Sequence, residues 1–68
     1  MAESVYKVIE IVGTSSESWD AAAAAAVTRA GASLRDLRVA TVTELDLKVS
    51  DGSIVYRAKL KVSFKFEE

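Results

Sequence analysis

The sequence predicts an α+β fold of β-α-β-β order, with a three-stranded antiparallel sheet wrapped around one helix. Three observations predict it: a stretch rich in β-branched residues, a run of six alanines, and two long alternating stretches joined by an Asp-Gly pair. With 68 residues, the chain has room for a single domain, which we expect to span residues 1–68.

The first predicted strand covers residues 4–12, with the sequence SVYKVIEIV. β-Branched side chains dominate this stretch and Lys7 and Glu10 are its only charges, a composition typical of a strand. Gly13 follows and is expected to end the strand.

The helix is expected to begin at residues 14–17, because Thr14 and Glu17 have the spacing of a capping box. Ser15 and Ser16 are alternative N-caps. Gly31 is predicted to end the helix in a left-handed conformation.

The helix is expected to pack by a face of small side chains, which lets a sheet approach closely. The alanines 21–26 have the highest helix propensity. The predicted apolar stripe has spacings of three and four and consists of Trp19, Ala23, Val27 and Ala30.

The second predicted strand runs from Arg38 to Val49. Alternation assigns one face to Val39, Thr41, Thr43, Leu45, Leu47 and Val49. The other face begins apolar and becomes charged, with Ala40, Val42, Glu44, Asp46 and Lys48. Neither face is uniformly polar in this interpretation.

The third predicted strand covers residues 54–67 and follows the tight turn Ser50-Asp51-Gly52-Ser53. About 14 strand residues span about 46 Å, whereas a helix of about 15 residues spans about 22 Å. The helix is thus too short for the hairpin, so we expect Phe64 and Phe66 to need cover from another chain. The first and third strands are expected to be the sheet edges, which closed assembly would pair.

Composition favours the same conclusion. A domain of this size buries only about 60% of its unfolded surface and needs additional stabilisation. The chain has no Cys and no His, which excludes disulfides and structural zinc sites. A homo-oligomer remains as the means of stabilisation.

Several function classes are disfavoured. Without His, Cys or a Gly-rich phosphate loop, the chain lacks the usual acid-base pairs and nucleophiles, so we do not expect an enzyme. A net charge of −1 disfavours nucleic acid. The longest apolar run is too short for a membrane span, and the N-terminus resembles no signal peptide, so we expect a cytoplasmic protein.

Few residues are candidates for binding. Trp19 could stack on an aromatic ligand, but its position on the helix stripe favours packing. Arg38 and Arg57 could bind phosphate or carboxylate, or form ion pairs. A basic strand edge, expected to oppose aggregation, consists of Lys59, Lys61 and Lys65.

Carboxylates are the candidate metal ligands. Calcium and magnesium prefer oxygen ligands, which this chain offers at Glu17, Glu44, Asp46 and Asp51. They do not have EF-hand spacing. A symmetry axis would multiply each carboxylate, so a hydrated cation shared between subunits is one hypothesis.

Taken together, the chain resembles the dodecins, small proteins of this element order that form hollow homododecamers. The resemblance covers residues 4–67. It is carried by YKVIEIVGTS at residues 6–15, by the Ala-rich helix and by KVSFKFE at residues 61–67.

The resemblance implies a small-ligand site between subunits, which in the family holds flavin such as riboflavin or FMN. At the implied flavin-site positions this chain has Val39, where the family has a stacking Trp, Arg57, where it has a Gln, and Thr41. Loss of the Trp removes a stacking interaction that contributes about 1–3 kcal/mol per ring. The implied flavin site is therefore weakened.

The chain is more similar to a dodecin subgroup that lacks this Trp and for which calcium binding is described. Ser18-Trp19 and Arg38-Val39-Ala40 carry that similarity, and Glu17 and Glu44 match positions where family members hold hydrated cations. Three hypotheses follow: a flavin or small-ligand carrier, a calcium- or magnesium-binding or purely structural cage, and an adaptor for an acidic partner.

Overall fold

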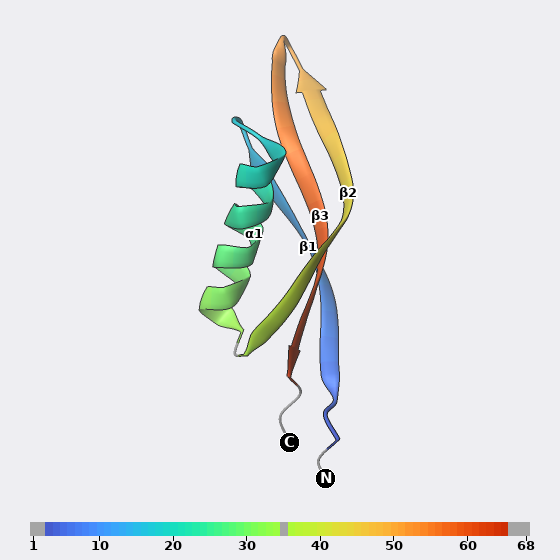
Figure 1. Ribbon diagram of the computed structural model, residues 1–68. Helices are drawn as coiled ribbons and strands as arrows, with labels where there is room; N and C mark the ends of the chain where they lie inside the picture. Colours follow the sequence, from blue (N-terminus) through green and yellow to red (C-terminus); the bar gives the residue numbers. More distant parts are fainter. Residues whose placement is uncertain (1–2, 35, 66–68) are drawn as a thin grey trace.

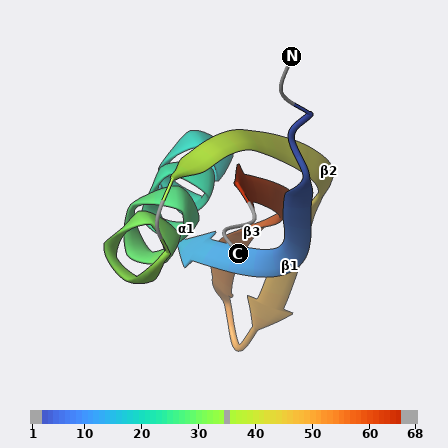
Figure 2. The same ribbon diagram turned by 90° about the horizontal axis from the view of Figure 1, so that it is seen from below.

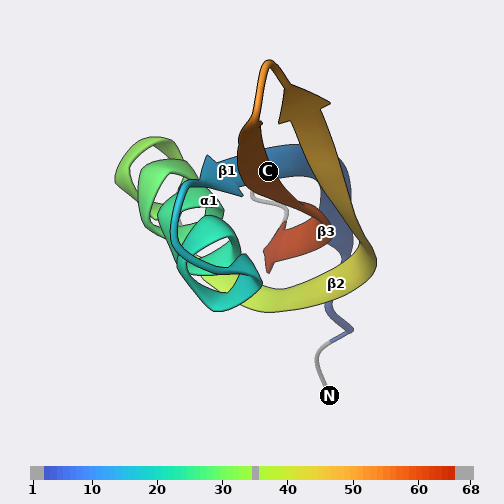
Figure 3. The same ribbon diagram turned by 90° about the horizontal axis from the view of Figure 1, so that it is seen from above.

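The computed structural model describes residues 3–34 and 36–65 and has the predicted β-α-β-β order (Figure 1). Its elements are β1 (Tyr6–Ser15), α1 (Trp19–Ser33), β2 (Leu37–Ser50) and β3 (Ser53–Lys65). The strongly twisted sheet curls around one side of the helix, which is clear along the long axis in Figures 2 and 3. Phe66 and Glu67, assigned to the third strand from the sequence, lie outside the described residues.

The sheet is antiparallel with the strand order β1-β3-β2, so β3 is the central strand. The prediction that the first and third strands form the edges is wrong for the third. The helix returns the chain so that β2 runs parallel to β1, and β3 fits antiparallel between them. Lys59, Lys61 and Lys65 therefore lie along the middle of the sheet and form no basic edge.

Gly13 lies inside β1, which continues to Ser15, so the prediction that this glycine ends the strand is wrong. A Cβ at Gly13 would collide with the carbonyl oxygen of Ala22 and lie 2.8 Å from the Cβ of Ala26. Only glycine allows the helix backbone to approach the strand this closely. Pairing with β3 then carries the strand past it.

The helix begins later than predicted. Ser18 is the N-cap, and its hydroxyl oxygen accepts a hydrogen bond of 3.0 Å from the backbone N–H of Ala21. Thr14 and Ser15 still belong to β1, so neither the capping box of Thr14 and Glu17 nor a cap at Ser15 or Ser16 forms. The pairing of β1 with β3 outweighs the local capping signal.

The helix also ends later than predicted, at Ser33. Gly31 is an ordinary helical residue, and the C-cap Leu34 donates its N–H to the carbonyl of Ala30 at 2.8 Å. Among the described residues of this connection, Asp36 is left-handed, with φ 54°. Asp tolerates that conformation through its short polar side chain, so a glycine is not required there.

Two shifts of register divide β2 and correct the predicted faces of this strand. They lie between Leu37 and Val39 and between Val42 and Glu44. At the second shift, Thr43 is the extra residue, and its hydroxyl donates to the carbonyl of Lys59 at 3.2 Å. One extra residue turns every later side chain to the opposite face.

In the corrected assignment, one face is uniformly apolar and the other is mainly polar. Residues of β2 that pair with the buried side of β3 are all apolar: Ala40, Val42, Leu45, Leu47 and Val49. Those that pair with the opposite side are Val39, Thr41, Glu44, Asp46 and Lys48. The sequence pattern predicted mixed faces because it assumed regular alternation along the whole strand, whereas the bulge at Thr43 reverses the alternation.

The core lies between the helix and the middle of β3. Its buried side chains are Ala22, Ala26, Ala58, Leu60 and Val62. Packing by small helix side chains is confirmed, but the buried face of the helix is centred on Ala22 and Ala26. Ala23 and Val27 of the predicted stripe flank it and are partly buried.

The β2-β3 hairpin extends well beyond the start of the helix, as Figure 1 shows. The molecule measures 55 × 20 × 15 Å. On the helix-facing side, exposed apolar side chains continue along the hairpin from the row of Gly13 and Ala58 into this extension, namely Leu45, Leu47, Val49 and Ile54. Phe64, expected to need cover, is partly buried. Exposed apolar side chains are also present near this end of β3, at Tyr6, Val8 and Val39.

Among the described residues, no helix has the length and apolar character needed to cross a membrane.

Candidate functional site

The candidate site lies on the outer face of the sheet, which we define as the face turned away from the helix. Two rows of paired residues cross the three strands there. One row consists of Val12, Lys59 and Glu44, and the next of Thr14, Arg57 and Asp46. The rows surround a shallow hollow lined by Val12, Glu44, Asp46, Arg57 and Lys59.

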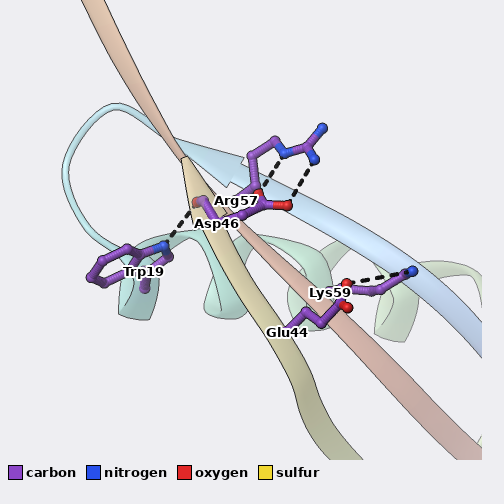
Figure 4. A network of polar contacts seen from close by, with 5 residues as sticks. All are labelled: Trp19, Glu44, Asp46, Arg57 and Lys59. Atoms are coloured by element: carbon purple, nitrogen blue, oxygen red, sulfur yellow. Dashed lines mark hydrogen bonds and ion pairs between the residues drawn. The ribbon is translucent and has the colours of Figure 1, made fainter. Parts of the chain in front are cut away.

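Arg57 and Asp46 form a two-pronged ion pair across the hairpin (Figure 4). Arg57 Nε donates to Asp46 Oδ1 at 2.7 Å, and Arg57 Nη2 donates to Asp46 Oδ2 at 2.9 Å. These hydrogen bonds lower the pKa of Asp46 and raise that of Arg57. Both carboxylate oxygens and one side of the guanidinium are therefore occupied within the chain.

Lys59 and Glu44 form the second ion pair, which is looser. Lys59 Nζ lies 3.7 Å from Glu44 Oε1, beyond hydrogen-bond distance. The Glu44 side chain is 66% exposed. This carboxylate is held by charge alone and faces solvent.

Trp19 joins the start of the helix to the hairpin from the other side of the sheet (Figure 4). Its Nε1–H donates to the carbonyl oxygen of Asp46 at 3.0 Å, and its ring meets that of Tyr56 edge to face at 5.2 Å. These contacts support the packing interpretation of Trp19. They also fix the backbone beside the Asp46–Arg57 pair.

The pairing of Asp46 with Arg57 was missed by sequence reasoning, which treated the two residues separately. The signal was present in the turn. Ser50 pairs with Ser53, and counting outward from this closed hairpin matches Asp46 with Arg57 and Glu44 with Lys59.

The implied flavin-site residues share the outer face but are not brought together within one chain. Val39 pairs with Ser63 and Thr41 with Lys61, whereas Arg57 lies six residues along β3 from Ser63. Six strand residues span about 20 Å. A pocket that uses both Val39 and Arg57 would need more than one subunit.

The candidate metal ligands are also dispersed. Glu17 is exposed in the connection between β1 and α1, Glu44 lies on β2, and Asp51 is in the hairpin turn. Within the described part of the chain, no three acidic, His or Cys side chains gather closely enough to hold a metal ion. Calcium takes six to eight oxygen ligands, so Glu44 fits as one contributor to a site that other subunits or water complete.

Comparison with known proteins identifies the family. The family model for dodecin matches residues 5–67. The chain belongs to the dodecin family. The fold agrees, since a dodecin structure from Streptomyces coelicolor has a TM-score of 0.91 and 39% identity, and the alignment covers 100% of this chain and 99% of that one.

One relative within the family bears a calcium name. Calcium dodecin from Mycobacterium tuberculosis is 62% identical over 63 residues, which cover 91% of this chain and 89% of the relative. Its crystal structure, described as having a novel calcium-binding site, has a TM-score of 0.87 and covers 93% of this chain and 91% of that chain. Dodecin from Thermus thermophilus is 40% identical, with 94% of each chain covered.

Neither of these relatives bears an enzyme name, and dodecins are a family of small binding and storage proteins.

Proposed function

We propose that this chain is a subunit of a homododecameric cage that binds calcium through carboxylates, with Glu44 as a ligand and Glu17 as a second contributor. The observation that carries the proposal is the 62% identity to a calcium dodecin over nearly the whole chain. The exposed Glu44 carboxylate supports it, because its oxygens are of the type that calcium prefers.

Assembly is part of the proposal for a chemical reason. The described residues of one chain supply too few clustered oxygens for calcium, and a symmetry axis would bring copies of the same carboxylate together. The exposed apolar residues of the hairpin give each subunit a further reason to associate. Magnesium accepts the same ligands but demands stricter octahedral geometry, so calcium is the preferred ion.

Titration calorimetry of chelator-treated, assembled protein with calcium chloride tests this function. We expect saturable binding, weakened at least about tenfold by Glu44→Gln, since even residues beside a metal ligand change affinity 10- to 100-fold. Glu10→Gln is the matched control, because Glu10 lies on the outer face but pairs with Lys61. No binding by the wild type, or equal losses in both variants, would contradict the proposal.

We infer that flavin binding is weak in this family member. Val39 offers no stacking ring, and the Arg57 guanidinium is engaged by Asp46 on one side. Fluorescence titration with riboflavin and FMN should give little quenching for the wild type. The Val39→Trp/Arg57→Gln double variant should gain quenching, and strong quenching by the wild type would contradict the inference.

A further inference from the structure

The two carboxylates of the outer face are held in different ways. Asp46 has both oxygens bonded by one rigid guanidinium, at 2.7 and 2.9 Å. Glu44 lies two residues away on the same face of β2 and has a single contact of 3.7 Å with Lys59. Of the two, Glu44 is the carboxylate that an incoming cation can take over.

The chemistry of the two cations explains this difference. Arginine has a planar fork that matches both oxygens of a carboxylate, whereas lysine carries a compact, mobile point charge. An exposed pair of the Lys59–Glu44 type contributes little and is screened by salt. Lys59 can therefore leave Glu44 without breaking a hydrogen bond.

Resting on the calcium binding proposed above, we propose that Lys59 is a built-in competitor that sets the calcium affinity of Glu44. A divalent cation that binds Glu44 must displace or tolerate the ammonium group beside it. Lys59 also lines the hollow that Glu44 and Asp46 share, so its charge lies beside both carboxylates. The Lys59–Glu44 contact thus raises the calcium concentration needed to load the site.

Three single variants of the full-length, assembled protein test this inference by calcium titration at low ionic strength. Lys59→Met removes the charge but keeps the apolar stem, and should bind calcium about two- to fivefold more tightly than the wild type. Lys59→Arg offers a fork to Glu44 and should bind more weakly. Lys61→Met is the matched control, because Lys61 pairs with Thr41 on β2 and with Glu10 on β1, so neither of its cross-strand partners is Glu44.

The tightening in Lys59→Met should shrink as salt is raised, because the competing charge is exposed. Sedimentation of each variant checks that the assembly is unchanged. Wild-type affinity in Lys59→Met, or equal tightening in Lys61→Met, would overturn the inference while leaving calcium binding intact. Absence of calcium binding in the wild type and all three variants would overturn the proposed function as well.

Discussion

The middle of the sheet and the hairpin end differ sharply in how they are covered. In the middle, the helix lies against Gly13 and a row of small and branched side chains, and Leu60 is 1% exposed. Toward the hairpin end, where the helix begins, the cover is incomplete, and Leu47 is 44% exposed. The chain therefore has one closed core and, at the hairpin end, apolar side chains that its own helix leaves exposed.

This contrast is sharpest for leucine at the two positions. Leu60→Ala should lower the free energy of unfolding by about 2–5 kcal/mol, because it leaves a cavity in a closed core. Leu47→Ala leaves that core intact and should instead shift the mass distribution toward smaller species. Urea denaturation measures the free energy of unfolding, and sedimentation velocity measures the mass distribution. If the two variants behaved alike in both measurements, the difference between the core and the hairpin end would be refuted.

The two glycines near the helix offer a second comparison. Gly13→Ala should destabilise the fold by about 1–3 kcal/mol, because the added methyl meets the helix backbone at Ala22. Gly31→Ala should stabilise it by about 0.5–1 kcal/mol, since the added methyl would meet no atom within 4 Å beyond its own stretch of helix and the residue is helical. Chemical denaturation of both variants shows whether each substitution raises or lowers the free energy of unfolding. Stabilisation by Gly13→Ala would refute the close approach of the helix to the strand.

The smallest expected effect concerns the ion pair between Asp46 and Arg57. In the folded protein, the hydrogen bonds from Arg57 lower the pKa of Asp46 from the usual 3.8, so the pair stabilises the fold at pH values above 3.8. This contribution is lost as pH falls through the lowered value. A double-mutant cycle with Asp46→Asn and Arg57→Gln should give a coupling at pH 7 that is lost as the Asp46 carboxyl is protonated in acid, and a coupling that does not decline with pH would contradict the assignment.

The fold class was accessible from the sequence because alternation, the alanine run and the Asp-Gly turn all agree with one arrangement, and the family was accessible from the resemblance of residues 6–15 and 61–67 to the dodecins. The helix ends were not, because pairing of β1 with β3 carries the strand through Gly13 and past Thr14. The central place of β3 follows from the path of the helix between parallel strands, which no local pattern encodes.

The candidate site shows the same division. The choice of Glu44 and Arg57 as residues of interest required only their chemistry, but their common face depends on the bulge at Thr43. A one-residue bulge changes no composition and interrupts alternation only once. Counting from the turn predicts the pairs with Arg57 and Lys59, yet it does not predict where the register shifts beyond them.

Sedimentation equilibrium over a wide range of protein concentration is the most direct test that the core is completed between chains. The account predicts a species of twelve times the 7.3 kDa of one chain, whose thermal midpoint falls on dilution. A folded 7.3 kDa monomer with a concentration-independent midpoint would contradict it.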